Sequence, residues 1–261
     1  MIAVAERING MYSDVKKAIK NRDPAVIHDL AKRQTEAGAS YLDLNVGPGI
    51  ADQPEAMKWL VGATQEASKT PVSVDSQKLD VAKAGLEAAS GQPLINSCKG
   101  LEVLDEWVAL ALEHDASLVC LTIDKRGIPQ DIDTRLEIAA AIVGTAIEKG
   151  LEPTRLFIDP ILFPVNVDQK QPNYLLEVCR QISIISDPPP HIICGLSNLS
   201  QGTKERSLIN RAYLTMALTA GLDSAVMDVL DKDVMDAAIT TEMLLNKQIY
   251  SDAFLKAARG R

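Results

Sequence analysis

The sequence predicts an α/β protein, a single (β/α)8 barrel (TIM barrel) that spans residues 1–261 as one domain. Eight apolar runs with the character of buried strands alternate with stretches in which apolar residues recur every three or four positions. The length of 261 residues fits one such barrel, for which about 250 residues is typical. Apolar residues make up 46% and aromatic residues only 4%, so the core must consist of alanine, valine, isoleucine and leucine, which suits helices packed on parallel strands.

The eight predicted strands are short, rich in β-branched and aliphatic residues, and followed by turn residues. They are expected near residues 2–6, 41–46, 72–75, 94–97, 117–123, 156–159, 191–196 and 224–228. No linker, low-complexity stretch or change of composition interrupts the series, which favours one domain. A doubly wound sheet is the alternative, but no GxGxxG motif follows any strand.

Helix signals lie between the strands. Asp23 and Pro24 supply an N-cap and a proline for the first turn of one helix, and Pro54 begins the next. The predicted buried face of that second helix consists of Met57, Leu60, Val61 and Thr64. A later apolar stripe, which precedes Gly150, consists of Leu136, Ala140, Val143 and Ile147. A short extra helix is expected from Tyr250 to Ala258.

Charge and cysteine usage narrow the class of protein. Asp and Glu total 35 against 27 Lys and Arg, and the net charge of −8 without a basic run argues against nucleic acid as a partner. The cysteines are far apart and form no CxxC pair, so we expect buried thiols in a reducing compartment; they are Cys98, Cys120, Cys179 and Cys194. The N-terminus lacks the regions of a signal peptide, and no apolar run approaches the ~18 residues of a membrane-spanning helix. A soluble, cytoplasmic protein with no membrane partner is therefore expected.

Four of the predicted strands stop at an acid or an amide. The runs are VSVDS at 72–76, LINS at 94–97, LFIDP at 156–160 and HIICGLSN at 191–198. They deliver Asp75, Asn96, Asp159 and Asn198. The other strand ends bring Glu6, Arg7, Asn9, Asp43, Asn45, Ser97, Thr122, Asp124, Ser197 and Asp228. One acid at a strand end often caps the next helix, but polar groups at all eight ends indicate a site at the barrel mouth.

This polar mouth suits a flat heterocycle that presents several N–H donors. Ionised aspartate only accepts hydrogen bonds, and a carboxylate that faces two adjacent N–H groups forms a bidentate pair, as guanine-like and pterin-like rings allow. A divalent metal is the alternative use of clustered carboxylates. No acidic DxD pair supports it, and His28, His114 and His191 lie away from the mouth, so no bound metal is expected. No nucleophilic serine or cysteine is paired with a mouth histidine, which argues against acyl transfer.

The ordered motifs at the strand ends carry a family resemblance. AERINGMYSD, LDLNVGPG, VDS, INS, IDP and GLSNLSQG together resemble the methyltetrahydrofolate:corrinoid methyltransferases. That family belongs to the pterin-binding barrel superfamily, which also includes dihydropteroate synthase and the folate-binding module of cobalamin-dependent methionine synthase. The resemblance covers essentially the whole chain and implies a dihydropteroate-synthase-like barrel.

The resemblance also implies roles for individual residues. The family's pterin-anchoring trio corresponds to Asp75, Asn96 and Asp159, and its mobile catalytic asparagine near N5 corresponds to Asn198. Further pterin contacts are expected from Glu6, Asn9, Asp43, Ser97, Gln201 and Arg206. Loop structure explains Gln201 equally well, and a solvated surface charge explains Arg206. Lys125 and Arg126 are expected in solvent, with the folate glutamate tail or an acidic partner as the alternative, and Cys98 is expected to pack or to support the site.

The activity that follows from the resemblance is methyl transfer between N5 of tetrahydrofolate (or 5-methyltetrahydrofolate), the substrate, and the cobalt of a corrinoid (cobalamin). N5 leaves poorly unless it gains a proton or a strong hydrogen bond, and the amide of Asn198 is expected to make that contact, with Asp43 or Asp228 extending the network. No DxHxxG cobalamin-binding loop occurs, so the corrinoid is expected on a separate protein that docks over the mouth. A homodimer is also expected, and the direction of transfer stays open.

Two alternatives remain. A dihydropteroate synthase shares the pterin pocket, but here the eighth strand ends AVMDV without that family's Arg-x-His-Asp, and the seventh ends GLSN. A non-catalytic folate-binding protein would bind methyltetrahydrofolate stoichiometrically without transferring its methyl group.

Overall fold

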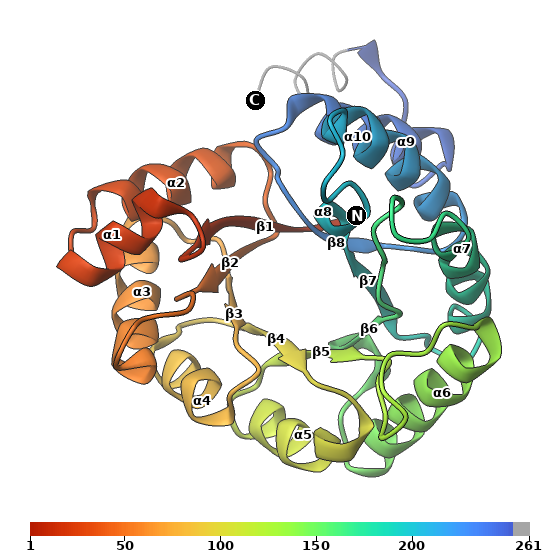
Figure 1. Ribbon diagram of the computed structural model, residues 1–261, viewed down its shortest axis with the longest axis horizontal. Helices are drawn as coiled ribbons and strands as arrows, with labels where there is room; N and C mark the ends of the chain where they lie inside the picture. The colour runs from red at the N-terminus through yellow and green to blue at the C-terminus, as the bar shows by residue number, and fades with distance from the viewer. Residues whose placement is uncertain (253–261) are drawn as a thin grey trace.

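Parallel strands close into a barrel in the computed structural model, which describes residues 1–252 (Figure 1). Within these residues the strands are β1 (Ile2–Asn9), β2 (Tyr41–Asn45), β3 (Val72–Asp75), β4 (Leu94–Cys98), β5 (Ser117–Leu121), β6 (Leu156–Asp159), β7 (His191–Gly195) and β8 (Ser224–Met227). β1 pairs with both β2 and β8, which completes the ring in sequence order. The predicted fold class is therefore confirmed, whereas the single domain over residues 1–261 stays a prediction.

The helices form an outer ring around the strands, except the short α8, which lies inside that ring near β8 (Figure 1). They are α1 (Ser13–Asn21), α2 (Ala25–Glu36), α3 (Gln53–Ala67), α4 (Leu79–Ala88), α5 (Leu104–Glu113), α6 (Ile132–Glu148), α7 (Gln171–Ile182), α8 (Leu196–Leu199), α9 (Arg206–Thr219) and α10 (Lys232–Leu244), with 3-10 turns at Leu101–Val103 and Pro153–Arg155. No helix among residues 1–252 is long and apolar enough to cross a membrane. The extra helix expected from Tyr250 to Ala258 falls mostly outside the described residues.

Two strand boundaries differ from the prediction by more than one residue. β1 continues to Asn9, and its pairing with β2 shifts register between Ala5 and Ile8, so the strand takes up one extra residue beside Glu6. β5 stops at Leu121, because the amide of Ile123 turns back to bond the carbonyl of Leu121 at 2.8 Å.

Helix starts follow the expected capping chemistry, with one shift. The carboxylate of Asp23 accepts from the amide of Ala25 at 3.1 Å, but Pro24 occupies the N-cap, so α2 begins one residue later than predicted. Asp52 caps α3 through the amide of Glu55 at 3.2 Å, and Pro54 lies in its first turn. The predicted face of α3 is confirmed as buried: Met57, Leu60, Val61 and Thr64.

The predicted stripe of α6 is wrong. Ala140 is exposed and Ile147 is 47% exposed, whereas the buried face consists of Arg135, Ile138, Ala139, Ile142, Val143 and Ala146. Alanines occur on both faces of this helix, so they do not fix its orientation. A buried arginine also interrupts the apolar pattern that a sequence reading relies on.

The inside of the barrel has an apolar floor. It is a separate hydrophobic cluster with about one residue from each of several strands: Val4, Tyr41, Leu94, Val119, Phe157, Ile193 and Val226. Because side chains on a strand alternate between its two faces, the residue two positions further along also points inward. Five of those seven next inward positions are polar, which places a polar layer between the floor and the mouth.

Candidate functional site

The polar layer consists of Glu6, Asp43, Asp75, Asn96, Asp159 and Asp228. Five of them follow a floor residue at a spacing of two, as in Leu94–Asn96 and Phe157–Asp159. The structure therefore brings together the inward groups that the sequence assigned to the mouth. Their side chains meet at the carboxyl ends of the strands, where barrel enzymes hold their substrates.

Asp43, Asp75 and Asn96 lie on three adjacent strands, and hydrogen bonds and register contacts connect them to one another and to their neighbours. Asp75 and Asn96 are register partners on β3 and β4, and Nδ2 of Asn96 donates to Oδ1 of Asp43 at 3.1 Å. Oδ1 of Asp43 also accepts from Ser73 Oγ at 2.6 Å, and Oδ2 of Asp75 accepts from Asn45 Nδ2 at 2.7 Å. The supporting roles of Ser73 and Asn45 were not predicted, although both follow the alternation that places Asp75 and Asp43 inward.

Burial destabilises the ionised forms of Asp43 and Asp75. It raises the pKa of Asp75 to about 6, against the opposing hydrogen bond from Asn45. It also raises the pKa of Asp43 well above its usual range, and the neighbouring Asp75 carboxylate adds to that rise. A ligand that supplies N–H donors would favour the ionised form of both acids.

Asp159 lies apart from this group, at the end of β6. Its Oδ1 accepts from the amide of Ile161 at 2.8 Å. Burial raises its pKa to about 7, while this hydrogen bond and the positive charge of Arg135 act in the opposite direction. Asp159 is thus a third carboxyl group, after Asp43 and Asp75, whose charge depends on what binds beside it.

Asn198 occupies a different kind of position. It lies on the short helix α8 just beyond β7 and is exposed, and within residues 1–252 its side chain makes no hydrogen bond. A Cβ added at Gly195 would lie 2.7 Å from Nδ2 of Asn198, so the amide rests directly over the backbone of Gly195. The glycine of GLSN therefore provides the space that this orientation of the amide requires.

Glu6 and Arg206 meet at the loop that carries Asn198. Ser197 Oγ donates to Oε1 of Glu6 at 2.5 Å, and the guanidinium of Arg206 donates to the carbonyl of Ser197 at 3.0 Å and to Ser200 Oγ at 3.1 Å. Burial raises the pKa of Glu6, the Ser197 hydrogen bond lowers it, the carboxylate of Asp228 raises it, and Arg206 lowers it. The two residues thus brace the start of the loop after β7, and a pterin contact for either stays a prediction.

The remaining predicted contacts have simpler surroundings. Oδ1 of Asn9 accepts from the amide of Met11 at 2.9 Å, a local turn bond. Gln201 is exposed, and Ser97 is buried beside Asn96. Cys98 is buried, and its thiol donates to the carbonyl of Gly100 at 3.3 Å, which agrees with a packing role. The other three cysteines are also buried and free.

Two glycines hold the first two mouth loops together. A Cβ at Gly10 would lie 2.1 Å from the carbonyl oxygen of Val46, and one at Gly47 would lie 2.5 Å from the carbonyl carbon of Gly10. The amide of Gly10 donates to the carbonyl of Asn45 at 2.7 Å. This contact fixes the backbone beside Asn45, the residue that holds Asp75.

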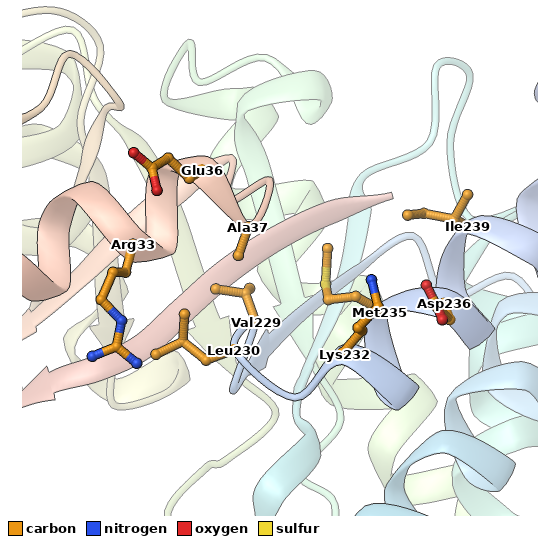
Figure 2. A pocket seen from close by; sticks show the side chains of 9 residues that line it. All are labelled: Arg33, Glu36, Ala37, Val229, Leu230, Lys232, Met235, Asp236 and Ile239. Atoms are coloured by element: carbon orange, nitrogen blue, oxygen red, sulfur yellow. The ribbon is translucent and has the colours of Figure 1, made fainter. Parts of the chain in front are cut away.

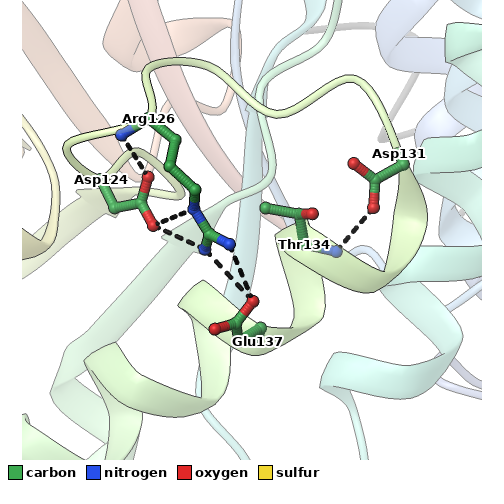
Figure 3. Close-up of polar contacts among 5 residues, drawn as sticks. All are labelled: Asp124, Arg126, Asp131, Thr134 and Glu137. Carbon is green, nitrogen blue, oxygen red and sulfur yellow. Dashed lines mark hydrogen bonds and ion pairs between the residues drawn. The ribbon is translucent and has the colours of Figure 1, made fainter.

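Arg126 is engaged by its own loop (Figure 3). Its Nε donates to Oδ2 of Asp124 at 2.7 Å, and Nη1 and Nη2 each reach Oε2 of Glu137 at 3.2 Å. The nearby Asp131 caps α6 through the amide of Thr134 at 2.8 Å. Arg126 thus binds two carboxylates of its own chain, while Lys125 is exposed.

The described residues contain no arranged metal ligands, and their groove on the outside of the barrel is separate from the mouth. Among residues 1–252 no group of three or more His, Cys, Asp or Glu side chains is arranged to hold a metal ion. A groove of about 300 Å³ lies outside the barrel, between α2 and the start of α10, with Arg33, Val229 and Met235 in its wall (Figure 2). None of the polar layer lines it.

Comparison with known proteins agrees with this geometry. The family model described as pterin binding enzyme matches residues 5–228. The chain is 35% identical to methylcorrinoid:tetrahydrofolate methyltransferase of Eubacterium limosum, over 99% of this chain and 96% of that protein. It is 30% identical to methionine synthase of Mycobacterium leprae, over 87% of this chain but only 20% of that longer protein. A solved dihydropteroate synthase of Yersinia pestis, bound to a pterine-sulfa conjugate, has the same fold, with a TM-score of 0.70 at 16% identity over 94% of each chain.

Proposed function

This chain belongs to the pterin-binding enzyme family, and within that family we propose that it is a methyltransferase that moves a methyl group between N5 of tetrahydrofolate and the cobalt of a corrinoid held by a separate protein. The observation that carries the proposal is the polar layer: buried carboxyls with raised pKa values face the mouth beside an asparagine that is free to move. The full-length relative of Eubacterium limosum, whose name gives both substrates, supports the same activity.

The pterin ring would be held by Asp75, Asn96 and Asp159. The N–H groups on one edge of the ring would supply further donors to the two buried carboxylates, and the Asn96 amide can donate or accept. Hydrogen bonds to the ionised form lower the pKa of a carboxyl. Binding of an N–H-rich ring therefore relieves the cost of charge in this layer, which makes the layer selective for such a ring.

N5 would lie near Asn198. Its amide nitrogen would donate to N5 as negative charge develops there during methyl departure, N5 would take a proton from solvent to leave as tetrahydrofolate, and the reverse reaction would release that proton. The amide has no competing bond within the described residues, so it can follow the substrate. Asp43 and Asp228, which both act on Glu6 through their charge, would extend the polar network.

The corrinoid would arrive on a partner that docks over the mouth. Several loops that follow strands carry exposed apolar side chains, among them Met11 at 71%, Ile128 at 45% and Val167 at 71% exposed. Such side chains on the loops around a site suit contact with another protein. Serine at all three positions would weaken transfer to the partner while leaving transfer to free cobalamin unchanged.

The deciding experiment is anaerobic. The protein is mixed with 5-methyltetrahydrofolate and cob(I)alamin, and the visible spectrum is followed for conversion to methylcobalamin; methylcobalamin with tetrahydrofolate tests the reverse direction. We expect conversion in at least one direction, abolished in a heat-denatured sample. Binding of methyltetrahydrofolate without conversion in either direction would establish the non-catalytic alternative instead.

We also propose that the protein acts in the cytoplasm as a homodimer. Four buried free thiols are compatible with a reducing compartment. Analytical ultracentrifugation at micromolar concentration measures the oligomeric state, and sedimentation as a monomer would contradict the dimer.

A further inference from the structure

Arg135 is a buried cation with few partners. It lies on the inner face of α6, and its side chain is fully buried. Its Nη2 donates to Oε1 of Gln171 at 2.6 Å. Its Nε and Nη1 have no hydrogen-bond partner in the part of the chain that the structure describes. Arginine is almost never found fully buried unless it is paired, so this residue calls for an explanation.

The surroundings of Arg135 lead to Asp159. Asp131, Tyr213 and Asp159 act on the guanidinium through charge alone, without a hydrogen bond to it. The guanidinium carbon of Arg135 lies 5.7 Å from the ring centre of Phe163, which belongs to the loop that follows Asp159. Through Gln171, whose Nε2 donates to the carbonyl of Gln130 at 2.8 Å, it is also linked to the loop after β5. Arg135 therefore lies behind the Asp159 side of the mouth.

A purely structural role does not account for the charge. Removing an arginine from water without a carboxylate partner is costly, and a well-packed apolar side chain of similar volume is often equally or more stabilising. The hydrogen bond to Gln171 needs a donor but not a cation. The positive charge acts on two carboxylates: Asp131, at the exposed start of α6, and Asp159, the polar-layer residue whose charge it favours.

We propose that Arg135 is a positioning residue for Asp159, supplying from behind the barrel wall the positive charge that this carboxylate needs in order to accept N–H groups from the substrate. The inference rests on the proposed pterin site. The other titratable groups that face Asp159 are the thiols of Cys179 on α7 and Cys194 on β7, and burial raises the pKa of both, so they stay neutral. Arg135 is thus the cation that acts on Asp159 within the described residues.

Two variants separate the charge of Arg135 from its hydrogen bond. Arg135→Lys keeps a donor and the charge, whereas Arg135→Gln keeps a donor without the charge. Burial raises the pKa of Asp159 to about 7, so about half of it is ionised at neutral pH. A further rise of about one pKa unit without the cation would leave about a tenth ionised and weaken binding about fivefold.

Calorimetric titration with tetrahydrofolate at pH 7 and pH 9 measures this effect. We expect Arg135→Gln to bind about fivefold more weakly at pH 7 and nearly normally at pH 9, and Arg135→Lys to stay within about twofold of the natural protein at both. In an Asp159→Asn background, Arg135→Gln should cause no further loss. Equal weakening at both pH values, or the same loss with lysine, would show a merely structural role and overturn the proposal.

A second readout needs no folate. In protein labelled with ¹³C at the aspartate carboxyls, the Asp159 signal, assigned by its absence from Asp159→Asn, is titrated with pH. We expect a higher pKa for Asp159 in Arg135→Gln, or in Arg135→Met if the glutamine variant does not fold. An unchanged pKa overturns the role of Arg135, whereas failure of the natural protein to bind tetrahydrofolate overturns the proposed function alone.

Discussion

Replacing Gly195 with alanine tests the role of Asn198 without removing its amide. The φ of Gly195 is −74°, which alanine adopts freely, so the backbone is not strained. A Cβ there would lie 2.7 Å from Nδ2 of Asn198 where ordinary contact begins at 3.4 Å, so the amide must move by about 0.7 Å (3.4 − 2.7 Å). A misplacement of about 1 Å can cost about 10²-fold in rate. We therefore expect kcat to fall by about tenfold to a hundredfold, with the Kd for tetrahydrofolate nearly unchanged.

Stopped-flow methyl transfer to cob(I)alamin measures kcat, and fluorescence titration measures binding. Gly62→Ala on α3 is the matched control, because a Cβ there meets nothing within 4 Å. In an Asn198→Ala background the Gly195 substitution should cause no further loss, since the group it displaces is gone. An unchanged kcat in Gly195→Ala, or an equal additional loss in the double variant, would refute the role given to the amide of Asn198.

Three further predictions follow from the same geometry. Asn198→Ala should lower kcat by at least about tenfold and weaken folate binding much less, and unchanged turnover in this variant would contradict the role of Asn198. Asp75→Ala or Asp159→Ala should instead weaken binding first, by about 1–3 kcal/mol in a titration, because a buried acceptor is lost. Because burial raises the pKa of Asp75 to about 6 and of Asp159 to about 7, the folded chain binds protons that the unfolded chain releases. These acids should therefore make the unliganded protein more stable to urea at pH 5.5 than at pH 8 and folate binding weaker at the lower pH, and the stability trend should flatten when both become asparagine. Gly47→Ala should lower the free energy of unfolding by about 1–3 kcal/mol, because Gly47 has a φ of +70° and its Cβ would lie 2.5 Å from the carbonyl carbon of Gly10; a urea midpoint equal to that of the natural protein would contradict this.

Much of the barrel and its polar layer could be predicted because strands carry their geometry in the sequence. A run such as LFID fixes both the strand and the direction of its last side chain, since alternation places Phe157 and Asp159 on the same face. The floor residue and the polar residue above it are thus readable together. Parallel strands also end at one side of a barrel, so separate runs could be expected to meet.

The supporting contacts could not be read in the same way. Asn45 and Ser73 were available in the sequence, but which acid each would bond depends on the stagger between neighbouring strands. Arg135 escaped prediction for another reason: a charged residue on a helix is expected in solvent, and only the packing of α6 against the barrel buries it. Because Arg135 was expected in solvent, the buried face of α6 was also predicted wrongly.

The site divides between residues that are fixed and one that can move, and the division follows from where each lies. Asp75 and Asp159 end their strands and Asn96 lies within β4, and the positions of these strands are set by pairing on both sides, so the three side chains can hold a ring in one orientation. A rigid clamp binds the substrate and the transition state about equally and therefore gives affinity without rate. Asn198 lies past the last paired residue of β7, exposed and without a hydrogen bond in the described part of the chain, so its amide can respond to charge as it develops on N5. Placing the responsive group outside the sheet keeps the contact that changes during the reaction from disturbing those that hold the ring.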